Sequence, residues 1–204
     1  MVFHLGNIYI SIDTLTFIME QKSIFKSSVW KVFEIFIDEP RKVHYIKEIS
    51  KKINLAPTSV KKYIENLQKN DMIIKTKGNI FNGYIANRDY NEFLFYKRIF
   101  NLIKIKESKL VDYLITLLYP TAIILYGSYV RGEDIEESDI DLLIISKVKK
   151  RFEIESFEKI LHRKIHIIID ENLKNLNKNL RQEIINGYVL YGYLKDGWRN
   201  FPGK

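Results

Sequence analysis

The sequence contains no cysteine and no long run of apolar residues. The absence of cysteine excludes disulfide bonds, thiolate zinc sites and cysteine nucleophiles, and it fits a reducing compartment. A membrane-spanning helix needs about 20 consecutive apolar residues, and the longest runs here, such as AIILY at 122–126, are far shorter. The first residues also lack the basic start and small-residue cleavage site of a secretory signal. We therefore expect a cytoplasmic protein with no membrane partner.

Charge is unevenly distributed along the 204 residues, whose formal net charge is +8. Residues 41–77 hold ten Lys or Arg and three acids, whereas residues 133–141 hold six acids and no base. A basic segment indicates a polyanionic partner such as nucleic acid, and an acidic cluster indicates cations. Because two different ligands are indicated, we expect two domains. There is no internal repeat and no low-complexity segment.

The basic half has the periodicity of three short helices followed by a β-hairpin. Apolar residues recur at helical spacing in three stretches, and Pro57 suits the first position of the third helix. Two β-prone runs around Lys77-Gly78-Asn79 predict the hairpin. The apolar positions are Val29, Val32, Phe33, Phe36 and Ile37, then Ile46, Ile49 and Ile53, then Val60, Ile64 and Leu67. This order resembles a winged helix-turn-helix domain covering residues 28–88.

A winged helix-turn-helix domain implies that the third helix contacts double-stranded DNA. With that helix in the major groove, Lys61 and Lys62 would lie near phosphates, and Thr58 and Ser59 within reach of base edges. Surface lysines usually only face solvent, and many such domains bind protein, so a protein partner is the alternative. The basic excess on this one segment favours DNA.

The rest of the chain is predicted to comprise four further parts. They are an N-terminal extension (1–27), a linker helix (89–107), a second domain (108–195) and a loose C-terminal tail (196–204). The linker helix is predicted from an apolar stripe at helical spacing. The stripe consists of Phe93, Tyr96, Phe100 and Ile103.

The acidic cluster follows a buried-type strand that ends in Gly127-Ser128. A glycine lets the backbone approach a ligand closely, and a serine offers a hydroxyl and an N–H, as phosphate cradles require. After ten more residues, Asp139 and Asp141 flank Ile140 at the start of a second strand, so both carboxylates share one face. Such a pair needs a cation, and its hard oxygen ligands favour Mg²⁺ or Mn²⁺ carrying the phosphates of ATP or another nucleoside triphosphate. Two metal ions about 4 Å apart would stabilise the attacking and leaving oxygens of a nucleotidyl transfer.

The spacing of these residues resembles the GSx10DxD signature of minimal nucleotidyltransferases in the DNA polymerase β superfamily. Arg131 and the glycine after it match the Arg-Gly usually found inside the gap. The resemblance implies an α+β protein, in which the winged helix-turn-helix precedes a short mixed sheet flanked by helices. It implies that Gly127, Ser128 and Arg131 contact the nucleotide and that Asp139 and Asp141 bind the metals. Relatives transfer a nucleotide to a protein, often as part of a toxin–antitoxin pair, to an antibiotic or to RNA.

One position departs from the family pattern. Relatives carry a third carboxylate in a segment resembling RKVDLV, and in the corresponding segment 163–168 (RKIHII) that position is His166. Imidazole is a poor ligand for Mg²⁺, and the attacking group loses its expected base. Asp170 has the same side-chain parity but lies about 13 Å further along the strand. The other histidines are expected on the surface; they are His4, His44 and His162.

Three interpretations of His166 are open. It acts as a base from an altered position, or it binds a softer metal, or it fills the place of a lost carboxylate in a domain that binds nucleotide without turning it over. The sequence thus predicts a metal-dependent nucleotidyltransferase that transfers NMP to an unknown acceptor, which includes the case of a protein. The alternative is a DNA-binding transcriptional regulator or an antitoxin whose degraded transferase domain only binds nucleotide or a partner.

Overall fold

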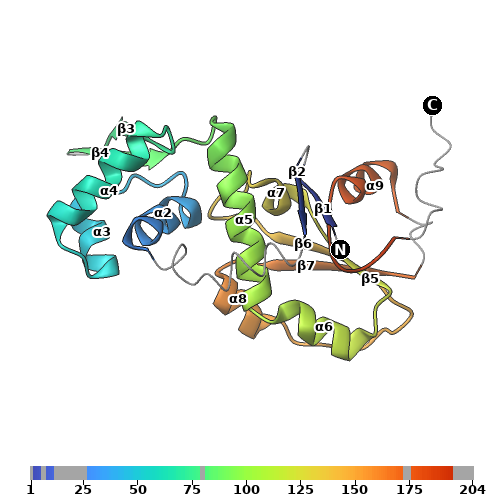
Figure 1. The fold of residues 1–204 in the computed structure, drawn as a ribbon. Helices are drawn as coiled ribbons and strands as arrows, with labels where there is room; N and C mark the ends of the chain where they lie inside the picture. Colours follow the sequence, from blue (N-terminus) through green and yellow to red (C-terminus); the bar gives the residue numbers. More distant parts are fainter. Residues whose placement is uncertain (1, 6–7, 12–26, 79–80, 172–175, 195–204) are drawn as a thin grey trace. The chain divides into compact units, whose positions relative to one another are not determined.

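The computed structural model describes residues 2–5, 8–11, 27–78, 81–171 and 176–194. The chain divides into two compact units, Met1–Asn87 and Arg88–Lys204, and each contains helices and a small sheet (Figure 1). The mixed α+β composition is as expected. Most of the predicted extension 1–27 and all of the predicted tail 196–204 lie outside the described residues. No helix within the described ranges is long and apolar enough to cross a membrane.

Among the described residues of the first unit, three helices precede an antiparallel hairpin. They are α2 (Ser28–Asp38), α3 (Ile46–Ile53) and α4 (Pro57–Lys69), followed by β3 (Ile73–Lys77) and β4 (Asn82–Ala86). The side chain of Ser27 caps α2 by accepting a hydrogen bond from the Trp30 amide, and Pro57 starts α4. The predicted apolar stripes supply the core, in which Phe36, Ile49 and Ile64 are buried. At the N-terminus, β1 (Val2–Leu5) and β2 (Ile8–Ser11) form a separate antiparallel pair.

One histidine of this unit is not where the sequence places it. His44 is buried rather than exposed, because its backbone exchanges hydrogen bonds with Tyr84 and draws the residue under the hairpin. Its Nε2 lies 2.9 Å from the carbonyl oxygen of Glu39, and its ring packs edge-on against Phe36. Burial lowers the pKa of His44. The residue is therefore part of the core.

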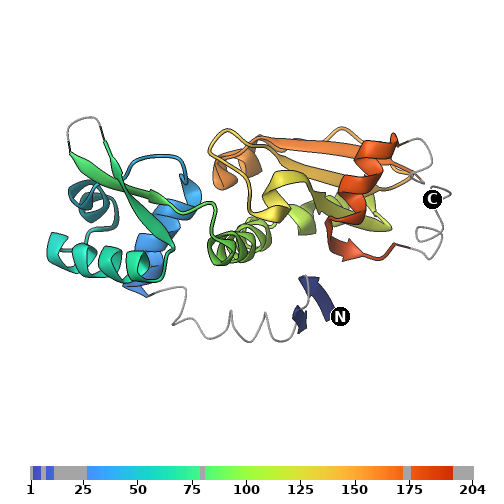
Figure 2. The same cartoon turned by 90° about the horizontal axis from the view of Figure 1, so that it is seen from above.

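The second unit is a mixed four-stranded sheet with helices on both faces (Figure 2). The sheet order is β7-β6-β5-β8, with β6 and β7 parallel and β5 antiparallel to both of its neighbours. The strands are β5 (Ala122–Tyr126), β6 (Ile140–Ile145), β7 (Ile165–Asp170) and β8 (Tyr188–Gly192). The helices are α5 (Asn91–Glu107), α6 (Leu110–Leu118), α7 (Gly127–Arg131), α8 (Glu155–Leu161) and α9 (Lys178–Ile185).

The two faces of this sheet bury different sets of side chains. Ile123 and Leu125 of β5 pack with α6 and α8, whereas Ile124 and Tyr126 pack with Ile184 of α9. In Figure 1, α9 lies above the strands, and α6 and α8 lie below them. Because strand residues alternate between faces, the odd-numbered residues of β6 face α9.

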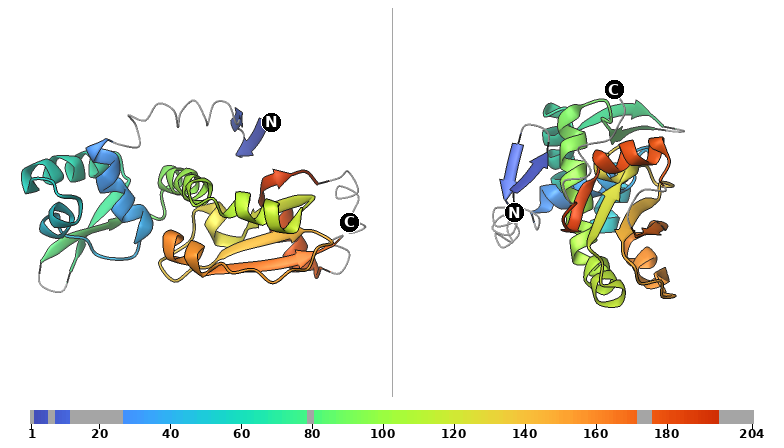
Figure 3. Two further views of the ribbon diagram at one scale, coloured as in Figure 1. Left: turned by 90° about the horizontal axis from the view of Figure 1, so that it is seen from below. Right: turned by 90° about the vertical axis from the view of Figure 1, so that its right-hand side faces the viewer.

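The helix predicted as a linker lies in the second unit and packs against α6 and α7 (Figure 3). Its buried face contains Phe93 and Phe100 of the predicted stripe, but Tyr96 is 37% exposed, and Lys97 and Asn101 are buried instead. Both buried polar side chains have a buried partner, Asp134, from a distant part of the chain. The helix is therefore turned relative to the apolar pattern, toward its polar partner.

Candidate functional site

The end of β5 lies against the start of β6 at a glycine. Gly127 has a φ of +78°, and a Cβ placed on it would lie 2.5 Å from Asp141 Oδ2. The sequence predicts that this glycine lets a ligand approach, and in the structure a carboxylate of the chain itself occupies the space that a side chain here would need. Ser128 follows at once in α7, partly exposed. The predicted Gly-Ser turn therefore forms the first two residues of the short helix α7.

Strand pairing places three polar side chains side by side across the sheet. Asp141 is paired with Tyr126 of β5 on one side and with His166 of β7 on the other. His166 Nδ1 lies 3.4 Å from Asp141 Oδ1. The His166 side chain is 60% exposed and that of Asp141 only 26%. His166 therefore lies beside the second aspartate at an open edge of the site.

Negative charge at Asp141 is disfavoured by its surroundings. Burial is the main cause that raises its pKa, and the carboxylates of Asp139 and Glu183 raise it further, while His166 opposes the rise. Burial, with a smaller effect from Asp141, also raises the pKa of Tyr126 to about 12. The tyrosine is therefore a neutral neighbour at physiological pH. A cation at this point would stabilise the ionised form of Asp141.

Asp139 precedes β6 and is exposed, whereas Ile140 between the two aspartates is fully buried. Ile140 is held in place by its amide, which donates to the carbonyl of Lys164 over 2.8 Å. Because the intervening residue points into the core, Asp139 and Asp141 are directed to the opposite face. They are the two carboxylates of the predicted cation site.

The acidic segment 133–141 does not act as one cluster. Glu133 forms an ion pair with Arg131, at 2.7 Å. Asp134 is turned inward and pairs with Lys97 over 3.1 Å, with both side chains 1% exposed. These two acids each have a basic partner of their own, which leaves Asp139 and Asp141 as the acids assigned to the cation.

Two residues of the site region have roles that sequence reasoning missed. Arg131, expected at the nucleotide, contacts the carboxylates of Glu133 and Glu183 and so links α7 to α9. These partners raise the pKa of Arg131, Glu133 most of all. Glu183 also adds negative charge near Asp141. No local spacing in the sequence indicates Glu183, because it lies on α9, which follows β7 in the chain.

The residues fit a cation that is shared with a bound phosphate group. Within the described ranges, no group of three or more His, Asp or Glu side chains is arranged to hold a metal ion. Asp139 and Asp141 supply two carboxylates, and Mg²⁺ is commonly bound by one or two carboxylates together with substrate phosphates and water. The destabilised charge of Asp141 is the observation that favours a cation there.

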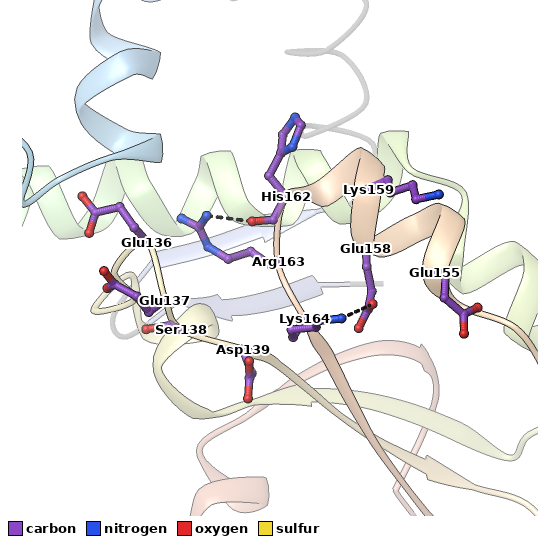
Figure 4. Close-up of a pocket in the computed structure, with 10 residues that line it drawn as sticks. All are labelled: Glu136, Glu137, Ser138, Asp139, Glu155, Glu158, Lys159, His162, Arg163 and Lys164. Carbon is purple, nitrogen blue, oxygen red and sulfur yellow. Dashed lines mark hydrogen bonds and ion pairs between the residues drawn. The ribbon is translucent and has the colours of Figure 1, made fainter.

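Asp139 also borders a cavity of about 450 Å³ (Figure 4). Its walls are the loop 136–139, the helix α8 and the segment 162–164. Within it, Lys164 Nζ donates to Glu158 Oε2 over 3.0 Å, and Glu158 Oε1 accepts from the Ile165 amide. Glu158 therefore fixes the start of β7, one residue before His166.

The four residues predicted to contact DNA all lie on α4. Thr58, Lys61 and Lys62 are exposed, and Ser59 is partly exposed. Lys61 forms an exposed ion pair with Glu65, at 3.9 Å. Other lysines of the unit have acidic partners outside α4: Lys42 pairs with Glu39 and Glu48, and Lys52 pairs with Glu39.

Comparison with known proteins identifies one part of the chain. Residues 107–191 match the family model of the nucleotidyltransferase domain. The matched part contains all four strands of the second unit's sheet except the last residue of β8. No curated protein and no solved structure matched the chain. The resemblance to polymerase β-type nucleotidyltransferases is confirmed over these residues.

Proposed function

We propose that the second unit transfers a nucleoside monophosphate from ATP or another nucleoside triphosphate to an acceptor. The family match over residues 107–191 supports nucleotidyl transfer, and the contact of Gly127 with Asp141 supports this place as the site. This contact places the Gly-Ser pair that follows β5 against the carboxylates at the start of β6. Residues separated by the ten-residue gap thus meet at one point.

Asp139 and Asp141 hold Mg²⁺ or Mn²⁺ in this proposal. Such a cation neutralises the nucleotide phosphates and the charge that develops on the leaving pyrophosphate. Ser128, directly after the glycine, offers its hydroxyl to the phosphates. Arg131 acts on the nucleotide only if it leaves Glu183, so its role is to hold α9 over the site until the nucleotide competes for it.

His166 determines whether bound nucleotide is turned over. Its contact with Asp141 orients the ring through Nδ1, which leaves Nε2 for a proton from the acceptor. The same position lacks the third carboxylate of the family pattern, so the site has one negative charge fewer for a second cation. We infer nucleotide binding with slow transfer as the basal activity. The alternative, a domain that only binds nucleotide or a partner, predicts no transfer at all.

We further propose that the first unit is a winged helix-turn-helix domain that binds double-stranded DNA through α4. The order of three helices and a hairpin supports the assignment. The exposure of Thr58, Lys61 and Lys62 on one helix supports DNA contact. A protein partner, as in an antitoxin, is the second candidate, and it is favoured if duplex DNA does not bind.

Calorimetric titration with ATP and Mg²⁺ tests the central proposal. We expect binding by the wild type and its loss in Asp139→Asn/Asp141→Asn, because the cation that carries the phosphates is no longer held. The matched control is Glu136→Gln/Glu137→Gln, which removes the same charge from the same loop and should bind normally. Equal affinity in the wild type and in the aspartate variant would contradict the proposal.

A further inference from the structure

A buried ion pair joins α5 to the acidic loop that carries Asp139. Lys97 Nζ lies 3.1 Å from Asp134 Oδ2, and both side chains are 1% exposed. Asn101 donates to Asp134 Oδ1 over 2.8 Å, and Arg163 Nη2 lies 3.9 Å from Oδ2. Burial raises the pKa of Asp134, and Lys97, Asn101 and Arg163 lower it. Charged groups are almost never fully buried unless paired, so these groups depend on one another.

A buried ion pair of this kind is expected to fix the position of the loop rather than to add net stability to the folded state. The cost of removing two charges from water cancels much of their attraction, so an intact buried pair contributes little net stability. Loss of one partner is costly, because the other is then buried and unpaired. The loop therefore cannot move away from α5 without a large penalty. The ion pair therefore restricts the loop to one arrangement.

The same face of α5 also contacts the backbone of residues 129–132, which precede Asp134 in the chain. Asn101 also donates to the Tyr129 carbonyl over 2.8 Å, and Arg98 Nε donates to the Arg131 carbonyl over 2.8 Å. A Cβ on Gly132 would lie 2.5 Å from the carbonyl oxygen of Leu94. The backbone of this segment is thus pressed against the helix from α7 up to Asp134.

Four residues connect Asp134 to Asp139, and they are tied together. The Ile135 amide donates to Ser138 Oγ over 3.0 Å, and the Ser138 amide donates back to the Ile135 carbonyl over 3.0 Å. Beyond Asp139, the Ile140 amide is fixed on Lys164. Lys164 is next to Arg163, which faces Asp134. Both ends of the short segment that contains Asp139 are therefore held with reference to Asp134.

From these contacts we infer that Lys97 and Asp134 are positioning residues for Asp139, and that α5 thereby sets the separation of the two carboxylates of the cation site. The inference rests on the proposed function, since it assigns Asp139 to that cation. One of the two residues, Lys97, precedes both the GSx10DxD motif and residues 107–191, whereas Asp134 lies within the ten-residue gap of the motif.

The test replaces both charges at once by Lys97→Met/Asp134→Leu, so that neither member of the pair is left buried without the other, while Arg163 keeps its hydrogen bond to the His162 carbonyl. Mn²⁺ binding to the full chain is measured by electron paramagnetic resonance with α,β-methylene-ATP present. We expect about tenfold weaker Mn²⁺ binding, the usual effect of losing a group that orients a metal ligand. Hydrogen exchange should become faster at the amides of Ile135, Ser138 and Ile140, and stay unchanged in β5.

The same replacement made in an Asp139→Asn variant distinguishes an effect on the position of Asp139 from a general disturbance of the fold. In the Asp139→Asn background, the same double replacement should cause no further loss of Mn²⁺ binding, since the residue through which it acts is already disabled. The control is Lys109→Ala/Asp112→Ala, which removes an exposed ion pair at the start of α6 in the same unit and should leave Mn²⁺ binding unchanged. Lys97→Gln/Asp134→Asn, which removes both charges and keeps two side chains that can form hydrogen bonds, serves if the apolar double variant does not fold.

The outcomes distinguish the two proposals. Wild-type binding with unchanged Mn²⁺ affinity and unchanged exchange in the pair variant overturns the inference alone. So does an equal loss of affinity in the Asp139→Asn background, because the effect would then not pass through Asp139. A wild type that binds neither Mn²⁺ nor the nucleotide analogue overturns the proposed function together with the inference.

Discussion

Gly127 and Asp141 are so close that a Cβ at residue 127 would lie 2.5 Å from the carboxylate oxygen Oδ2. The φ of +78° at Gly127 adds backbone strain to this contact for any residue with a side chain. Gly127→Ala is therefore expected to destabilise the folded state by about 1–3 kcal/mol from the backbone alone. Thermal unfolding checks this.

The steric part of the Gly127→Ala effect has its own control. In the Asp141→Ala background the carboxylate is absent, so the same replacement should cost less, and the difference measures the coupling of the two positions. Backbone strain remains in both backgrounds. An identical cost with and without the carboxylate would show that the two side chains do not compete for this space.

Asp141 makes the stability of the protein depend on pH. Its pKa is raised above the ordinary value of 3.8, mainly by burial, so the folded state holds this proton more tightly than the unfolded state. Stability therefore falls as pH rises from the ordinary value through the raised pKa, and stays lower above it. Asp141→Asn removes this loss. In EDTA, the variant should unfold at a higher temperature than the wild type at neutral pH, with the difference shrinking below the ordinary pKa.

Asp112→Asn is the matched control for the pH experiment, because Asp112 is an exposed carboxylate of the same unit. A difference between Asp141→Asn and the wild type that stayed constant from acidic to neutral pH would contradict the burial effect. Addition of Mg²⁺ and ATP should reverse the order, since only the wild type gains a bound cation.

Lys61 and Lys62 are expected to neutralise DNA phosphates. The logarithm of duplex affinity should fall linearly with the logarithm of salt concentration, and each lost contact should flatten the slope by about 0.9. Lys61→Ala/Lys62→Ala should therefore flatten it by nearly twice that amount. Fluorescence anisotropy with duplex DNA from the upstream region of the chain's own gene measures the slope.

Lys42→Ala/Lys52→Ala is the control for DNA binding, since it removes the same charge from two lysines of the same unit that lie outside α4 and pair with Glu39. This variant should keep most of the wild-type slope. If both lysine variants flatten the slope equally, α4 is not the contact surface. If the wild type fails to bind duplex at low salt, the first unit is a protein-binding module.

His166→Asp is expected to increase nucleotidyl transfer, because it restores the third carboxylate beside Asp141 and with it the charge for a second cation. The wild type should transfer slowly. Label from α-³²P-ATP on the protein or on a co-expressed partner reports the rate. The control is His162→Asp, which makes the same charge change at the end of α8, where the backbone has a φ of 53° that aspartate tolerates.

The opposite result for His166 is equally specific. Fast transfer by the wild type that disappears in His166→Asp would make the imidazole the base of the reaction. The contact between Nδ1 and Asp141 would then be the interaction that orients it.

Local patterns in the sequence predict those parts of the fold whose partners are near in the chain. Pro57 and the stripe of Val60, Ile64 and Leu67 specify the start and the buried face of α4 with no further information. The location of His166 beside Asp141 can also be predicted from the sequence, because the family pattern aligns the segment that contains the histidine.

Patterns of this kind miss contacts between distant charges. The apolar stripe of α5 predicts that Tyr96 is buried, but Lys97 takes that place because Asp134 supplies a buried counter-charge. Asp134 itself reads as one more member of an acidic surface run. Glu183 reaches the site only through the packing of α9, so no spacing from Asp141 indicates it.

The pairing of β6 with β7 makes the protein sensitive to chain length at one place. A shift of β7 by one residue would turn His166 to the other face of the sheet and bring an isoleucine beside Asp141. The Lys164 carbonyl and the Glu158 carboxylate fix this alignment through the amides of Ile140 and Ile165. Insertions and deletions in evolution should therefore be tolerated in the loop between β6 and α8 and excluded from residues 162–164.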